Sequence, residues 1–184
     1  MVTPEMGNRL PRHGYFAIDN GCYSKPHAFK WDKYQRYIDR LLTADGERCL
    51  FVAAPDAPFD ADGTLARFEE YGERMKATGA PVAVVTQDGM QAEDLPWNDI
   101  DALFIGGSTE WKTGQESAAI AHEAHRRGLW VHMGRVNGQS RFTAARTMGC
   151  DSVDGTFLAF APDLNWPSLH RWLSEAESAP VMVL

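Results

Sequence analysis

Six short apolar runs, separated by segments of helical period, constrain the fold of this chain more than any other feature. Each run is mostly apolar and ends at a polar residue or a glycine. Continuous apolar strands of this kind are typical of a parallel sheet that is buried on both faces. The predicted strands are Tyr15–Ile18, Cys49–Ala53, Pro81–Val85, Ala102–Ile105, Leu129–Met133 and Ser152–Val153.

Amphipathic segments lie between these runs and predict helices. Glycines such as Gly79 and Gly128 follow two of them and act as C-terminal stop signals. Asp60 and Asp62 have the character of cap or turn residues at the start of the second helix. The apolar residues 181–184 can form a closing strand. The predicted helices are Phe29–Thr43, Thr64–Thr78, Ser117–Arg127, Gln139–Met148 and Ser168–Ser174.

The alternation of strands and helices predicts a parallel α/β fold. The glycine-rich nucleotide fingerprints of doubly wound sheets do not follow the first strand. Polar residues follow nearly every strand, as in barrels, whose active sites lie at that face. A complete barrel takes about 250 residues, whereas this chain has 184. We therefore expect a single domain, 1–184, forming a reduced or incomplete (β/α) TIM-like barrel of about six to eight parallel strands.

Composition excludes several classes of protein. No apolar run approaches the roughly 20 residues of a membrane span, and no apolar leader is visible. Three cysteines without CxxC spacing suit a reducing compartment and predict neither disulfides nor a zinc site. The net charge of −7 argues against broad electrostatic binding to nucleic acid, although it allows a local basic patch. We expect a cytoplasmic protein with no membrane partner, no metal and no cofactor.

The polar residues that follow the strands predict a functional site. The carboxyl ends of parallel strands share one face, so these residues should converge there. A Gly-Gly pair lets a ligand approach backbone N–H groups closely. The alternative for each aspartate is a helix cap or a turn. The converging residues are Asp19, Asp56, Gln87, Gly106, Gly107, Gly134, Arg135 and Asp154.

Several carboxylates without a metal motif favour displacement at an anomeric carbon. One carboxylate can attack as the nucleophile while its partner moves a proton. The amide and the glycine backbone can read the edge of a planar base. His122 and His125 lie three apart on a predicted helix without a third ligand, and we assign them to a solvated face. His132 lies within a strand and belongs either to the core or to the cleft.

The same segments, in order, resemble the catalytic barrel of the tRNA-guanine transglycosylases and their DNA-modifying relatives. That family exchanges guanine for a 7-deazaguanine base. The segment IDNGCY at 18–23 is similar to the family's D-S-G-G-[FY]-Q, and DSVD at 151–154 is similar to its D-x-x-D. Four segments between them also match, namely VAAPDAP, VVTQDG, LFIGGSTE and VHMGRV.

The resemblance implies a role for each matching residue. Asp154 would be the nucleophile at C1′, and Asp19 the general acid and base. The base would lie between the side chains of Tyr23 and Met133. The groups that would read the edges of the base are Asp56, Gln87, Gly106 and Gly107.

The departures from the family pattern narrow the expected substrate. The tRNA enzymes carry a Cys/Cys/Cys/His zinc subdomain after the nucleophile, whereas here only Cys150 lies nearby. Asn20 and Cys22 replace the serine and a glycine of the first motif. The resemblance therefore points to the minimal, zinc-less type of bacteria and phages, which acts on guanine in DNA rather than in tRNA.

The expected partners are a purine or 7-deazapurine base and a nucleic acid. With few basic residues, the chain would need a local rim, a homo-oligomer or an accessory protein to hold a polymer. A flipped or single-stranded nucleotide is required, because guanine in a duplex cannot reach such a pocket. The candidate phosphate contacts are Lys112, Arg135, Arg141 and Arg146.

Two other functions use the same residues. If water replaces the incoming base, the aspartate pair makes an N-glycoside hydrolase, either a DNA glycosylase or a nucleoside hydrolase. If the chain has lost turnover, it is a non-catalytic purine or deazapurine binder. The sequence leaves both open.

Overall fold

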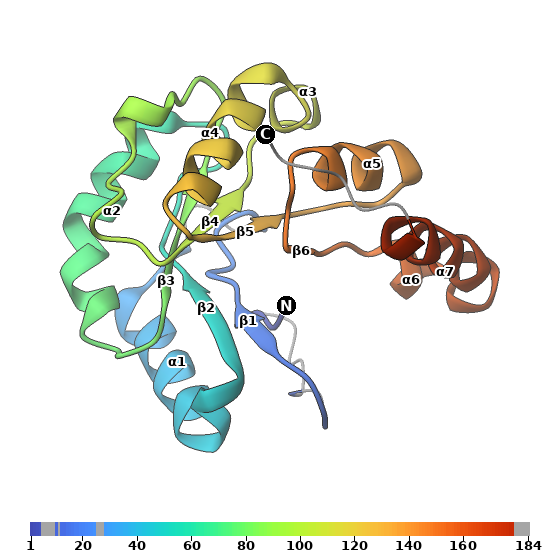
Figure 1. Ribbon diagram of the computed structural model, residues 1–184. Coiled ribbons are helices and arrows are strands. Elements are labelled where there is room, and N and C mark those ends of the chain that lie inside the picture. Colours follow the sequence, from blue (N-terminus) through green and yellow to red (C-terminus); the bar gives the residue numbers. More distant parts are fainter. Residues whose placement is uncertain (5–9, 11, 25–27, 179–184) are drawn as a thin grey trace.

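The fold is built on one curled parallel sheet, seen in a computed structural model that describes residues 1–4, 10, 12–24 and 28–178 (Figure 1). Six strands pair in sequence order from β1 to β6, and every pairing is parallel. The sheet curls without closing, which confirms the predicted incomplete α/β barrel. The strands are β1 (Phe16–Ile18), β2 (Cys49–Ala53), β3 (Val82–Thr86), β4 (Ala102–Ile105), β5 (Trp130–Met133) and β6 (Ser152–Val153).

Helices cover the convex face of the sheet. In Figure 1, α1, α2 and α4 lie along this face, whereas α6 and α7 lie beyond α5 at the β6 end. The helical elements are α1 (Trp31–Asp45), η1 (Gly46–Arg48), α2 (Ala61–Lys76), η2 (Ala92–Asp94), α3 (Thr109–Lys112), α4 (Gln115–Arg126), α5 (Gln139–Thr147), α6 (Phe157–Phe160) and α7 (Pro162–Ser178).

The predicted elements agree with these bounds to within a few residues, with one exception. Helix α2 begins at Ala61 because Asp60 is its N-cap and accepts a hydrogen bond from the Gly63 N–H at 2.9 Å. The last predicted helix, Ser168–Ser174, is wrong in extent, since α7 continues through Pro167. The predicted closing strand at 181–184 lies outside the described residues.

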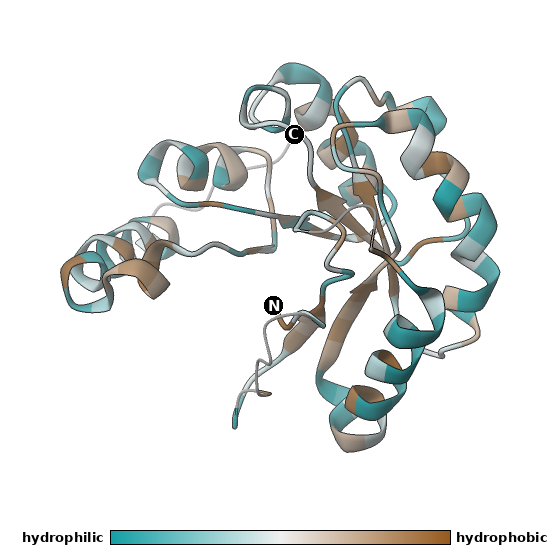
Figure 2. Ribbon diagram, turned by 180° about the vertical axis from the view of Figure 1, so that it is seen from behind, coloured by the Kyte–Doolittle hydropathy of each residue, from teal (hydrophilic) through white to brown (hydrophobic). Residues whose placement is uncertain are grey.

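The two faces of the sheet bury different side chains. Residues on the convex face pack against the helices in a large core that includes Met133. The concave face is filled mainly by alanines and two rings, Phe51 and Phe104, whose centroids are 6.2 Å apart. Figure 2 shows the apolar strands at the centre of the molecule and hydrophilic residues on the outer sides of the helices.

Alternation along β5 divides two neighbouring residues between these faces. The ring of His132 lies 5.4 Å from that of Phe51 and 4.8 Å from that of Phe104, so it belongs to the concave face. Met133, the next residue, is fully buried in the core on the convex face. Successive residues of a strand point to opposite faces, so only one of the two can point into the half-barrel.

Candidate functional site

Asp19 and Asp154 come from opposite edges of the sheet and influence each other at its carboxyl end. Asp19 follows β1, and Asp154 follows β6. The pKa of Asp19 is raised to about 6, first by burial and then by the charges of Asp56 and Asp154. The curl of the sheet therefore brings the first and last strands close enough for their carboxylates to interact.

Asp56 and Gln87 form a buried pair beside Asp19. Gln87 Nε2 donates to Asp56 Oδ2 at 2.6 Å, and Gln87 Oε1 accepts from the Phe59 N–H at 2.8 Å. Burial raises the pKa of Asp56 to about 6, while hydrogen bonding from Asn20 opposes this shift. Both ends of the Gln87 amide are thus engaged, which fixes its orientation. The pair presents a carboxylate and an amide side by side.

An aromatic rim, formed by Tyr23 and Phe59 with Arg135 between them, lies beside Asp154. The two rings are 53% and 52% exposed, and their centroids are 6.0 Å apart. The Arg135 guanidinium lies 4.4 Å from the Tyr23 ring centroid and donates to Tyr23 Oη at 3.0 Å. It also donates to the Gly107 carbonyl. A planar cation therefore occupies one face of an exposed tyrosine.

Backbone strain is concentrated at this rim. Phe59 and Arg135 have φ angles of 67° and 59°, in the left-handed region that side chains rarely adopt. They are the two non-glycine residues with positive φ in the described part of the chain. Such strain persists only where the surroundings enforce it, and it is common at functional sites.

The glycine pair is required by close backbone packing. A Cβ on Gly106 would lie 2.6 Å from the Thr86 carbonyl oxygen of β3. Gly107 has a φ of 71°, and a Cβ there would lie 2.7 Å from Asp88 Oδ2. The fold therefore needs glycine at both positions, whether or not a ligand also approaches the backbone here.

Asp154 is held by backbone and remains accessible. Its Oδ1 accepts the Arg135 N–H at 2.6 Å, and its side chain is 29% exposed. The left-handed conformation of Arg135 directs this N–H toward the carboxylate. The same Oδ1 lies 4.0 Å from His132 Nε2. Within the described residues no hydrogen bond reaches Oδ2.

Two residues predicted for the site lie elsewhere. Met133 packs in the convex core, so it does not face Tyr23 across a ligand. Lys112 is fully buried, and its Nζ donates to the Gly134 carbonyl at 2.5 Å, so it is not a surface contact for phosphate. Burial lowers the pKa of Lys112 to about 8, and the nearby charges of Arg135 and Arg141 act in the same direction.

Two residues were missed or left open by the sequence. Phe59 lies in the loop between β2 and α2, two residues before α2 begins, and an aromatic residue in a loop between a strand and a helix was the available signal. His132, which the sequence left between core and cleft, lies on the concave face beneath Asp154. Strand alternation alone could not assign it, because both His132 and Met133 can be buried.

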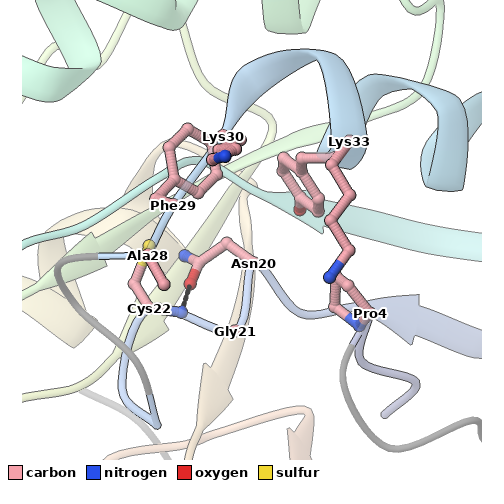
Figure 3. A pocket seen from close by; sticks show the side chains of 9 residues that line it. Pro4, Asn20, Gly21, Cys22, Ala28, Phe29, Lys30 and Lys33 are labelled. Atoms are coloured by element: carbon pink, nitrogen blue, oxygen red, sulfur yellow. Dashed lines mark hydrogen bonds between the residues drawn. The ribbon is translucent and has the colours of Figure 1, made fainter.

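A small cavity lies behind the loop that carries Asp19. It has a volume of about 30 Å³ and is lined by Asn20, Phe29 and Lys30 among others (Figure 3). Asn20 Oδ1 accepts the Cys22 N–H at 2.7 Å and closes this loop. The cavity can hold water, but it is too small for a purine. The candidate site rests instead on the carboxylates and the aromatic rim at the carboxyl ends of the strands.

Two features of the described residues bear on other classes of function. Among the described residues, no group of three or more His, Cys, Asp or Glu side chains is placed to hold a metal ion. None of the helices within the same residues combines the length and apolarity that crossing a bilayer requires.

The chain matches no known family profile and no curated protein. It is similar to parts of larger solved structures. The PaMucR phosphodiesterase in complex with c-di-GMP has 17% identity and a TM-score of 0.43, over 78% of this chain and 60% of that one. A mandelate racemase/muconate lactonizing enzyme-like protein from Rubrobacter xylanophilus has 12% identity and a TM-score of 0.43, over 78% and 46%.

A third structure is the YkuI protein of Bacillus subtilis, with an EAL domain, in complex with its substrate c-di-GMP and calcium. It has 10% identity and a TM-score of 0.41, over 89% of this chain and 45% of that one. The chain thus spans about half the length of the structures that it matches. None of these similarities bears on the chemistry of the site.

Proposed function

We propose that this chain is a base-exchange transglycosylase that replaces guanine in a nucleic acid with a 7-deazaguanine base. The observation that carries the proposal is the coupling of Asp19 and Asp154 at one end of the sheet, beside a buried carboxylate–amide pair and an exposed tyrosine. This set supplies a nucleophile, a proton carrier and groups that can bind a planar base.

The two aspartates divide the reaction between them. Asp154 Oδ2 attacks C1′ of the nucleotide and forms a glycosyl ester, while the bond from C1′ to guanine breaks. Asp19, protonated at the start, gives its proton to the departing guanine. It then takes a proton from the incoming base, whose nitrogen attacks C1′ and releases the Asp154 carboxylate.

The pKa of Asp19 suits this double role. A general acid and base works best when its pKa lies near the working pH. Burial and neighbouring carboxylates raise the pKa of Asp19 to about 6, so both its protonated and its ionised forms are populated near neutrality.

The base would bind between the aromatic rim and the Asp56–Gln87 pair. Its face would stack on Tyr23 in the place that the Arg135 guanidinium now occupies, and the displaced cation would be free to contact a phosphate. Its edge would bind Asp56 and Gln87, whose carboxylate and amide match the donors and acceptors of guanine. Phe59 is the apolar side chain that lies beside Tyr23. Met133, which was expected to pack on the base there, is buried in the core.

Incorporation of labelled base into DNA tests the proposal. Wild-type protein mixed with single-stranded guanine-containing DNA and labelled 7-cyano-7-deazaguanine should transfer the label to the DNA. Asp154→Asn should abolish transfer, because an amide is not a competent nucleophile. Asp151→Asn is the matched control from the same segment, since its amide oxygen can still accept the Val131 N–H.

Each other outcome identifies a different function. Abasic sites without incorporation would identify a glycoside hydrolase. Calorimetric binding of the base without any turnover would identify a binding protein. Full incorporation by Asp154→Asn would overturn the assignment of the nucleophile.

A further inference from the structure

His132 is a buried, neutral histidine that the proposed reaction does not use. Its side chain is 3% exposed and lies between the rings of Phe51 and Phe104. Burial lowers the pKa of His132 to about 4, although the charge of Asp154 opposes this shift. A polar ring in such surroundings is costly unless its nitrogens are hydrogen-bonded.

A chain of hydrogen bonds identifies which nitrogen of His132 carries the proton. Trp130 Nε1 can only donate, and it donates to Ser152 Oγ at 2.8 Å. Ser152 Oγ lies 2.8 Å from His132 Nδ1 and can give its own hydrogen to that nitrogen. This direction is favoured because the other ring nitrogen, Nε2, then faces the Asp154 carboxylate with a hydrogen and not with a lone pair. A neutral imidazole that accepts at Nδ1 carries its hydrogen on Nε2.

The protonated nitrogen faces Asp154. His132 Nε2 is buried, has no hydrogen-bond partner in the described part of the chain and lies 4.0 Å from Asp154 Oδ1. That oxygen already accepts the Arg135 N–H. Catalytic hydrogen bonds are often long in the free protein and shorten when substrate binds. A shift of about 1 Å would complete this one.

We propose that His132 is a positioning residue, which donates from Nε2 to Asp154 Oδ1 and thereby reserves Oδ2 for the sugar carbon. The two N–H donors on Oδ1 fix the rotation of the carboxylate. In the glycosyl ester Oδ1 becomes the carbonyl oxygen, and the same two N–H groups can donate to it. The consequence for turnover rests on the proposed function, whereas the hydrogen bond itself does not.

The charged groups around this pair are the same in all the variants considered. Asp19 from the end of β1 and Lys112 from α3 act on Asp154, and Arg135 lies beside it. The N-terminal amine acts on His132. A change in activity on replacement of His132 therefore reports the loss of the imidazole.

Nuclear magnetic resonance tests the proposal without substrate. Nitrogen-15 spectra of the wild-type protein at neutral pH should show His132 as the Nε2–H tautomer.

Activity provides the second measurement. In the base-exchange assay, His132→Leu should lower kcat about tenfold with little change in KM. His132→Gln, which keeps an N–H donor, should restore most of the lost activity. Ser152→Ala, which removes the donor to Nδ1, should also lower kcat, because the imidazole proton is then no longer kept on Nε2.

Two results would overturn the proposal. One is the Nδ1–H tautomer in the wild-type protein, a measurement that does not depend on whether any variant folds. The other is a kcat for base exchange in His132→Leu that equals the wild-type value. A protein that shows the expected tautomer but no base exchange would reject the proposed function and retain the assignment of Nε2 of His132 as the donor that faces Asp154.

Discussion

At the scale of single residues, the raised pKa that suits Asp19 for proton transfer in the proposed reaction also means that its ionised form destabilises the fold. Its pKa is raised from 3.8 to about 6 by burial and by Asp56 and Asp154. Between these two pH values the folded chain binds more protons than the unfolded chain. The free energy of unfolding therefore falls as the pH rises through this window, and it remains lower above pH 6.

Replacing Asp19 by asparagine should stabilise the protein at alkaline pH. Without a buried charge, Asp19→Asn should raise the free energy of unfolding by on the order of 1–3 kcal/mol at pH 8 and by little at pH 4. Denaturant unfolding at both pH values measures the difference. Asp39→Asn, at an exposed position on α1, should change little at either pH. Equal stabilisation at pH 4 and pH 8 would contradict the electrostatic explanation.

The sequence predicted the candidate residues at strand ends more readily than it predicted side-chain orientation. Asp19, Asp56 and Asp154 could be expected at one face because parallel strands end together. The choice between His132 and Met133 could not be made, because both tolerate burial and the choice depends on which side of β5 faces the half-barrel. Phe59 could not be assigned either, because its place depends on a left-handed backbone within a loop.

At the scale of elements, the junction between β3 and β4 has no room for a side chain at Gly106. Its Cβ would lie 2.6 Å from the Thr86 carbonyl oxygen and 2.8 Å from Val85 Cγ1. One of these atoms belongs to the backbone and cannot rotate away. The two strands would have to separate where they deliver Gln87 and Gly107 to the site.

Gly106→Ala should therefore destabilise the sheet. We expect the free energy of unfolding to fall by about 1–3 kcal/mol, as in overpacked cores, and base exchange to fall with it. Gly46→Ala is the control, because its φ is −57° and its nearest neighbour, Leu42 Cβ, would be at an ordinary 3.6 Å. Stability equal to that of the wild type in Gly106→Ala would show that the junction can expand.

The long elements were predictable because each has a strong local signal. Apolar runs marked the strands, and the cap at Asp60 together with helical period marked α2. The four-residue helices α3 and α6 carry too few residues to show a period. Helix α7 was predicted too short because it continues through Pro167, where a proline removes an interior hydrogen bond.

At the scale of the whole molecule, the last helices are attached through few side chains. Helix α7 contacts α5 and α6, away from α1, α2 and α4 (Figure 1). Trp172 is its buried anchor, with ring centroids 5.0 Å from Phe157 and 5.9 Å from Phe142. These contacts hold the segment that follows Asp154.

Trp172→Ala should loosen this end of the molecule without unfolding the rest. A buried tryptophan replaced by alanine costs about 3–5 kcal/mol, and here the loss should appear locally. Hydrogen exchange should rise in α5–α7 and stay unchanged in β2–β4. Trp166→Ala, at a residue 53% exposed, should leave exchange unaltered. Faster exchange across the entire sheet would show that the molecule unfolds as one unit.

The sequential order of the six strands also determines when the site can exist during synthesis. Each strand pairs with the one made just before it, so the sheet can grow behind the ribosome one unit at a time. Asp19 follows the first strand of this sheet, and Asp154 follows the last. The two carboxylates of the proposed reaction therefore meet only after β6 has docked, and we expect nascent chains that lack β6 to be inactive in base exchange.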